Sequence, residues 1–146
     1  MAIRVVFFDM GETLVTSGRR WLPGAEQLLL GLRQDGFRLG IISNTATLSR
    51  PEILQILPTN VDLTQFEQSL TLFSSEVGKA KPERAIFEEA VGRSGLSAQE
   101  CLYFSENIVE TLMAQEAGMR AVRVQVRPNS DLSVLRQQIR AFQDLI

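Results

Sequence analysis

Histidine is absent from this chain of 146 residues, and cysteine occurs once, at Cys101. Without histidine, the protein lacks the side chain that most often serves as a general base and as a ligand for transition metals. A single cysteine excludes an internal disulfide and argues against most structural zinc sites. Any chemistry must therefore depend on carboxylates, hydroxyls, lysine and backbone amides, with a hard cation that prefers oxygen ligands as the fitting metal.

Long apolar runs and a strong net charge are also missing. No run of 18 or more apolar residues is present, so we expect no transmembrane helix, and the N-terminus does not resemble a signal peptide. A net charge of −2 gives no electrostatic reason to expect nucleic acid or an anionic membrane as a partner. With 45% apolar and 22% charged residues the composition is that of a globular protein, which we expect to be cytoplasmic.

Lysine is the scarcer of the two strongly basic residues. Of 15 lysines and arginines, the only lysines are Lys79 and Lys81, which lie within the stretch 78–82. Lysine provides a compact point charge, whereas arginine provides a planar fork of donors. Lysine confined to this stretch therefore suits a site that requires a compact positive charge.

Strand-like and helix-like segments alternate along the chain, which predicts an α/β fold with a parallel sheet and helices on both faces. We expect strands at 3–8, 38–42, 70–74, 102–104 and 121–126, and helices at 23–36, 47–57, 83–93, 108–117 and 131–145. Pro82 is expected at the first position of its helix, and Asp131 is expected to cap the last one. Because no linker or repeat interrupts the pattern, residues 1–146 are predicted to form a single domain.

Polar side chains follow four of these strands at the points where the strands end. They are Asp9, Ser43, Lys81 near the third strand, and the pair Glu106 and Glu110. Loops that follow parallel strands open on one edge of the sheet, so these groups can converge there. The set suits displacement at phosphorus: Asp9 attacks, Ser43 and neighbouring amides hold phosphoryl oxygens, and Lys81 neutralises their charge. Mg²⁺ held by the carboxylates would bridge nucleophile and substrate.

Taken in order, these features resemble the four motifs of the haloacid dehalogenase (HAD) superfamily, over nearly the full length of the chain. The family's first motif, an apolar strand followed by Asp-x-Asp-x-Thr-Leu, reads Asp9-Met10-Gly11-Glu12-Thr13-Leu14. Its second motif, a Ser or Thr after the second strand, is matched by Ile41-Ile42-Ser43-Asn44. Its third, Gly-x-x-Lys-Pro with a later Ile-Phe, is matched at 78–82 and 86–87. Its fourth, an acidic pair before a helix that ends in Ala-Gly-Met, is matched at 105–110 and 117–119.

The resemblance implies a three-layer, Rossmann-like core with Asp9 on the central strand of five, and an aspartyl-phosphate formed on Asp9. In that scheme Asp9, Ser43 and Lys81 are the catalytic residues. The implied cofactor is Mg²⁺, held by Asp9, the backbone carbonyl of Gly11, Glu106 and Glu110. The implied substrate-binding residues are Gly11, Asn44, Arg19 and Arg20, the two arginines lying on a mobile turn and flap at 13–21 that covers the site.

The spacing between the motifs leaves no room for a separate cap domain. Residues 10–42 and 44–80, which separate the first three motifs, are each accounted for by one helix and short loops. Family members without caps tend to act on large substrates, or close the site with a neighbouring subunit. A macromolecular phosphorylated substrate and a homo-oligomer are therefore both open alternatives.

Two departures from the family pattern leave three functions open. Gly11 stands where the family's phosphatases have an Asp that protonates the leaving group, and Glu106 stands where Asp is usual. The first alternative is a Mg²⁺-dependent phosphatase with weakened acid–base catalysis, which typically contributes about 10²–10⁴-fold. The second is a catalytically degenerate member that serves as a binding or scaffold protein. The third is a metal-free, dehalogenase-like displacement, because residues 105–107 are partly similar to the Ser-Ser-Asn of true dehalogenases.

Overall fold

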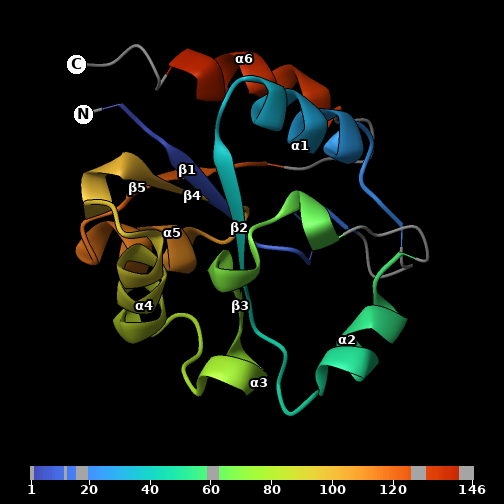
Figure 1. Ribbon diagram of the computed structural model, residues 1–146, viewed down its shortest axis with the longest axis vertical. Helices are drawn as coiled ribbons and strands as arrows, with labels where there is room; N and C mark the ends of the chain where they lie inside the picture. The colour runs from blue at the N-terminus through green and yellow to red at the C-terminus, as the bar shows by residue number, and fades with distance from the viewer. Residues whose placement is uncertain (1, 12, 16–19, 59–62, 126–130, 142–146) are drawn as a thin grey trace.

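The computed structural model describes residues 2–11, 13–15, 20–58, 63–125 and 131–141. Within these residues, five parallel strands form one sheet in the spatial order β3-β2-β1-β4-β5 (Figure 1). The strands are β1 (Val5–Phe8), β2 (Arg38–Ser43), β3 (Thr71–Phe73), β4 (Cys101–Ser105) and β5 (Arg120–Arg123). The predicted parallel sheet is confirmed, and β1, which leads directly into Asp9, is its central strand.

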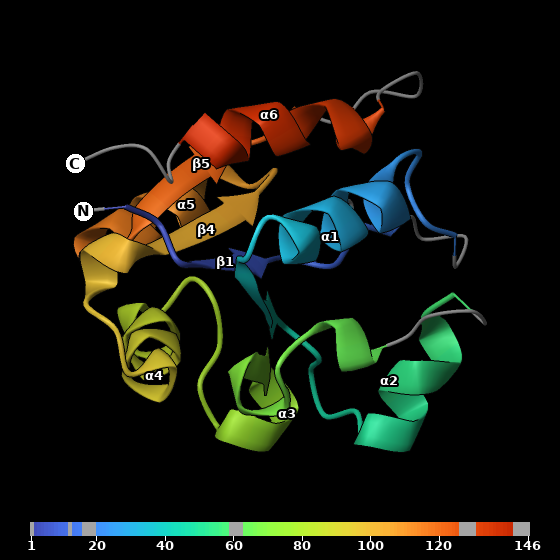
Figure 2. The ribbon, with the colours of Figure 1, turned by 45° about the horizontal axis from the view of Figure 1, so that its top comes forward.

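Helices cover both faces of this sheet (Figure 2). The α-helices of the described residues are α1 (Ala25–Gln34), α2 (Arg50–Ile56), α3 (Ser74–Val77), α4 (Arg84–Ser94), α5 (Ile108–Glu116) and α6 (Leu135–Arg140). Short 3-10 turns are η1 (Leu63–Gln65), η2 (Gln68–Leu70), η3 (Ala98–Glu100) and η4 (Leu132–Val134). Helices α1 and α6 pack on one face, and α4 and α5 pack on the other, which gives the expected three layers.

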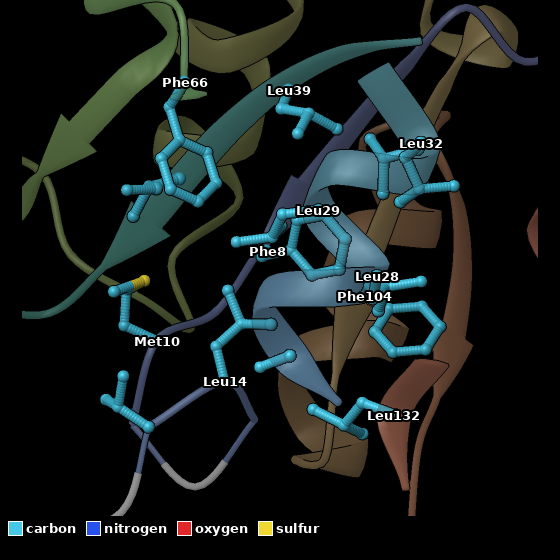
Figure 3. Close-up of a cluster of buried hydrophobic side chains, with 14 of the residues drawn as sticks. Phe8, Met10, Leu14, Leu28, Leu29, Leu32, Leu39, Phe66, Phe104 and Leu132 are labelled. Carbon is cyan, nitrogen blue, oxygen red and sulfur yellow. The ribbon is translucent and has the colours of Figure 1, made fainter. Parts of the chain in front are cut away.

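The apolar run of β1 explains why this strand is central. Val6 and Phe8 point into the cluster shared with α1, while Val5 and Phe7 point into the cluster shared with α4 and α5. All four side chains are fully buried. A strand that is buried on both faces must be apolar throughout, so its sequence shows no alternation. Figure 3 shows the first cluster, in which Phe8 lies among leucines of α1 and close to Phe104 of β4.

Two predicted helix starts differ from the structure. Helix α2 begins at Arg50, later than expected, because Ser49 and Glu52 form a capping box that fixes the start. Pro82 was expected to begin α4, but the helix starts at Arg84 after the cap Glu83. Two hydrogen bonds from the Asn44 side chain hold the backbone of Lys81, so the chain enters its helix only beyond Pro82.

The C-terminal segment is shorter as a helix than predicted. Asp131 does cap it, since its side chain accepts a hydrogen bond from the Ser133 backbone N–H, but the first turn is the 3-10 turn η4. Helix α6 follows as far as Arg140, and residues 142–145 of the predicted helix lie outside the described residues. The predicted fifth strand ends earlier, at Arg123, and its last predicted residue, Val126, also lies outside them.

The connections between the strands determine what can cover the site. In the described residues, α1 alone joins β1 to β2, and α2 with η1 and η2 joins β2 to β3, so neither connection contains an inserted domain. The edge of the sheet at the carboxyl ends of the strands is therefore not covered by a cap within these connections. None of the described helices is long and apolar enough to cross a membrane.

Candidate active site

Asp9 lies at the carboxyl end of β1, where ligands of parallel α/β sheets bind. Its backbone N–H donates a hydrogen bond to the carbonyl of Phe104 on β4, which fixes its main chain against the neighbouring strand (3.1 Å). Its side chain is 13% exposed, so the carboxylate is mostly removed from water but still reachable from outside. This combination suits a nucleophile.

Lys81 is the centre of a buried polar network around Asp9. Its side chain is 2% exposed, and Nζ lies 2.8 Å from Asp9 Oδ1 and 2.9 Å from Glu110 Oε1. Nζ also donates to the hydroxyl of Tyr103, at 3.1 Å. An ammonium has three donors, so these three partners satisfy it completely. Lys81 therefore holds together the carboxylates of Asp9 and Glu110, which lie far apart in the sequence, at one point on the edge of the sheet.

Asn44 positions Lys81. Its Nδ2 donates to the Lys81 carbonyl and its Oδ1 accepts from the Lys81 N–H, both at 2.8 Å. These bonds use one N–H and one lone pair of the amide, so a contact of Asn44 with a substrate stays a prediction.

Tyr103 and Ser105 of β4 complete the network, and neither is predicted from the sequence as a site residue. The Tyr103 hydroxyl donates to Glu110 Oε1 at 2.7 Å. Ser105 Oγ donates to Asp9 Oδ2 at 3.3 Å and approaches Glu110 Oε1 at 3.5 Å. Residues two apart on a strand share a face, so a polar 103/105 pair beside β1 was the available signal.

Glu106 follows Ser105 with its main chain fixed on both sides. Its N–H donates to Thr13 Oγ1 at 3.2 Å, and its carbonyl accepts from Arg123 Nε at 3.0 Å. Its residue is half-buried at the same sheet edge as Asp9. These two hydrogen bonds fix the backbone of Glu106 next to the loop that follows Asp9.

Gly11 and Ser43 lie at a cavity beside the network. The cavity has a volume of about 410 Å³, and both residues line it together with Asn44. Gly11 is exposed, and a Cβ at this position would meet no atom within 4 Å. The structure therefore brings together Asp9, Lys81 and Glu110 directly, and places Gly11 and Ser43 on the wall of the adjoining cavity.

The flap predicted at 13–21 is described only in part. Val15 forms a parallel bridge to Gly11 and an antiparallel bridge to Trp21, so this segment folds back beside the site. Arg20 is exposed, whereas Arg19 lies outside the described residues. A contact of either arginine with a substrate therefore remains a prediction.

Burial sets the protonation of this site. Desolvation raises the pKa of Asp9, and the positive charge of Lys81 opposes that rise. Desolvation, followed by the negative charges of Asp9 and Glu110, raises the pKa of Tyr103 well above its ordinary value. Tyr103 therefore stays protonated and donates its hydrogen to Glu110.

The charges at the sheet edge are compatible with a divalent cation. Two carboxylates, on Asp9 and Glu110, contact one ammonium, on Lys81, and the backbone of Glu106 is held at the same edge of the sheet, so a phosphate would meet excess negative charge. The described residues contain no group of three or more His, Cys, Asp or Glu side chains that could hold a metal by themselves. Mg²⁺ typically uses one or two carboxylates and takes its other ligands from water and phosphate, so Asp9, Glu106 and the Gly11 carbonyl fit.

Glu110, which the sequence predicts as part of the metal set, contacts the buried lysine. Its Oε1 forms an ion pair with Lys81 Nζ at 2.9 Å and accepts a hydrogen bond from the Tyr103 hydroxyl at 2.7 Å. These contacts make Glu110 a partner of Lys81 through Oε1, and its role as a metal ligand stays a prediction.

A buried carboxylate–lysine network at the edge of a Rossmann-like sheet defines this chain as an α/β core with a polar site at the strand ends. The family model of the haloacid dehalogenase-like hydrolases matches residues 19–118. The chain therefore belongs to this family.

One curated relative is the glyceraldehyde 3-phosphate phosphatase of Methanothermobacter thermautotrophicus. The two sequences are 35% identical over 115 residues, which cover 78% of this chain and 47% of the relative. The chain thus spans about half the length of the curated relatives that it matches.

Solved structures share the fold at lower identity. A HAD phosphatase from Thermococcus onnurineus superposes with a TM-score of 0.76 at 16% identity, over 98% of this chain and 100% of that one. A HAD family enzyme from Bacteroides thetaiotaomicron, in complex with magnesium and inorganic phosphate, gives a TM-score of 0.70 at 16% identity. That match covers 91% of this chain and 98% of the other. Solved structures of about this chain's length therefore share its fold.

Proposed function

We propose that this chain is a Mg²⁺-dependent phosphatase that forms an aspartyl-phosphate on Asp9. The observation that carries the proposal is the Asp9 carboxylate held by the buried ammonium of Lys81 at the open edge of the sheet, 2.8 Å away. The phosphatase named among the relatives, and the structural neighbour with magnesium and phosphate, support the same reaction class.

The chain's own residues account for both steps of the reaction. Asp9 Oδ2 has a longer, weaker hydrogen bond than Oδ1, so its lone pairs are freer to attack phosphorus. The phosphorus–oxygen bond to the leaving group breaks, and its electron pair departs on the leaving oxygen. Water then attacks the phosphorus of the aspartyl-phosphate, which releases phosphate and the Asp9 carboxylate, while the proton of the water passes to solvent.

The surrounding groups hold charge in place during these steps. Lys81 fixes Asp9 Oδ1 and keeps Glu110 from repelling the incoming phosphate, and Ser43 with neighbouring amides would hold phosphoryl oxygens from the cavity side. Bound between Asp9, Glu106 and the Gly11 carbonyl, Mg²⁺ would supply the positive charge that the phosphoryl oxygens require.

Gly11 limits the substrates that such an enzyme can use. No carboxylic acid stands at this position to protonate the leaving group, so leaving groups that are stable as anions are favoured. Because a Cβ at Gly11 would meet no atom within 4 Å, an aspartate can be introduced there without a steric clash.

The first prediction follows from the missing carboxylic acid at Gly11. Wild type, Asp9→Asn and Gly11→Asp are compared for phosphate release from an aryl phosphate with and without Mg²⁺. We expect turnover that needs both Mg²⁺ and Asp9, and an increase of about tenfold or more in Gly11→Asp, since general acid catalysis is worth at least that much. Absence of turnover in the wild type and in Gly11→Asp would contradict the proposal.

Gly11 also favours one alternative, a protein that binds a phosphorylated partner without turning it over. Phosphate binding that depends on Asp9 or Lys81, with no release of product by the wild type or by Gly11→Asp, would identify that role. A dehalogenase-like reaction is less well supported, because a 2-haloacid carries a carboxylate and no charged side chain lines the cavity among the described residues.

A further inference from the structure

The cavity beside Gly11 and Ser43 is large enough for the organic part of a substrate. Its volume of about 410 Å³ lies in the range of about 300–1,000 Å³ found for small-molecule sites. Beyond Gly11, Ser43 and Asn44, its wall is formed mainly by apolar side chains: Met10, Val15, Ile53, Ile56, Leu57 and Phe73. All of these are buried except Ile56, which is 56% exposed and forms the rim.

No charged side chain lines this cavity among the described residues. Arg50, the arginine of α2, pairs with Glu76 at 2.7 Å and lies over the ring of Phe73, 5.0 Å from its centre. Its charge is therefore directed to Glu76 and the ring. A substrate carboxylate or second phosphate placed in the cavity would lose water without gaining a cationic partner, which is unfavourable.

Few hydrogen-bonding groups of the wall are free for a sugar or polyol. The Asn44 amide is committed to the backbone of Lys81. Thr45 Oγ1 contacts Ser75 Oγ at 2.7 Å and accepts from the Ser75 N–H at 3.0 Å. A polyhydroxylated group would thus leave hydroxyls unsatisfied against an apolar wall, whereas an apolar ring would not.

The leaving group points to the same chemistry. Without an acid at Gly11, the leaving oxygen departs as an anion. A phenol has a pKa near 10, as in tyrosine, whereas an aliphatic alcohol resembles water and is a far weaker acid. An aryl oxide is therefore the far better unprotonated leaving group.

We propose that the substrates of this site are phosphate monoesters of an uncharged aryl group, with the ring in this apolar cavity. This inference rests on the proposed phosphatase function and names its substrate class. Asp9 forms the bond to phosphorus, the bond from phosphorus to the aryl oxygen breaks, and the electron pair leaves on the aryl oxide, which then takes a proton from water.

Binding of stable phosphonates tests the cavity without relying on turnover. Isothermal titration of the wild type with Mg²⁺ present compares benzylphosphonate, methylphosphonate and phosphonoacetate. We expect benzylphosphonate to bind about tenfold or more tightly than methylphosphonate, from the apolar area of the ring, and phosphonoacetate to bind no better than methylphosphonate. Equal affinity of the benzyl and methyl compounds, or no binding of the benzyl compound, overturns the inference.

A matched pair of variants on α2 localises the effect. Ile56→Arg places a cation at the rim, and we expect it to remove most of the benzyl preference and to strengthen phosphonoacetate binding. Leu54→Arg adds the same charge at a residue of the same helix that is 42% exposed and does not line the cavity. Leu54→Arg should leave all three affinities unchanged, and an equal effect of both variants would contradict the inference.

Acetyl phosphate separates the two proposals, because it has a good leaving group but no ring. Asp9-dependent turnover of acetyl phosphate without any preference for phenyl phosphate over glyceraldehyde 3-phosphate would overturn the aryl assignment alone. Benzyl-selective binding with no turnover of any of these esters would support the aryl cavity and overturn the phosphatase.

Discussion

At the scale of single residues, Lys81 is the group on which the rest of the site depends. Its ammonium lies between two carboxylates with a side-chain exposure of 2%, so each partner is held by a charge that water cannot replace. Removal of one member of a buried ion pair typically costs about 3–5 kcal/mol, because the remaining charge stays buried without a partner. Here the loss of the lysine would also leave Asp9 and Glu110 to repel each other.

Lys81→Met should therefore lower the free energy of unfolding by about 3 kcal/mol, measured by urea denaturation, and abolish any Asp9-dependent turnover. The double variant Lys81→Met/Glu110→Gln should recover part of that stability, since it removes one of the two unpaired charges. Lys79→Met is the matched control, because Lys79 pairs with Glu89 at the surface, where such pairs contribute about 1 kcal/mol or less. Equal losses in Lys81→Met and Lys79→Met would contradict a buried network.

At the scale of the elements, the sheet and the positions of Asp9 and Lys81 could be predicted because strong local patterns encode them. The apolar run of β1 marks a strand end, and Gly78 with Pro82 marks a turn around Lys81. The spacing of Tyr103 and Ser105 is a weak signal, because Tyr103 stands in an apolar run that is typical of the core, and Tyr103 is fully buried. The contact between Asn44 and Lys81 joins loops 37 residues apart, and only the tertiary fold specifies it.

Helix α6 is attached to the end of α1 by a charged contact. Arg136 donates from Nε and Nη2 to the two carboxylate oxygens of Asp35, each at 2.8 Å, and Arg140 lies 3.7 Å from the same carboxylate. The hydrogen bonds from Arg136 lower the pKa of Asp35 below its ordinary value. A lowered carboxyl pKa stabilises the folded state above the unfolded pKa of 3.8, and this stabilisation is lost as the pH falls through the lowered value.

Asp35→Asn should accordingly lower the midpoint of thermal unfolding by a few degrees at pH 7, and the difference from wild type should vanish as the pH falls below the folded pKa of Asp35. Thermal unfolding followed by circular dichroism across this pH range measures it. Glu116→Gln is a suitable comparison, because Glu116 is exposed at the end of α5 and does not contact Arg136. A difference between Asp35→Asn and wild type that persists unchanged at low pH would contradict the assignment.

At the scale of the whole molecule, the connections on either side of β2 leave the polar edge of the sheet open. Within the described residues no inserted domain covers Asp9, and the apolar cavity opens beside it. An open edge admits a phosphorylated side chain on a larger molecule as readily as a small ester. A macromolecular substrate and closure by a second copy of the chain therefore stay predictions that follow from this shape.

The charge balance of that edge leads to a prediction about metal binding that does not require turnover. Among the described residues, the Asp9 carboxylate has only Lys81 as a cationic partner and shares it with Glu110, and Glu106 forms no ion pair, so a divalent ion should bind the folded state and stabilise it by mass action. Millimolar Mg²⁺ should raise the midpoint of thermal unfolding of the wild type, and Asp9→Asn and Glu106→Gln should each weaken that rise. Glu116→Gln, an exposed glutamate at the far end of α5, should keep it. A rise of the same size in all four proteins would mean that Mg²⁺ acts on the surface in general and that Asp9 and Glu106 do not hold it.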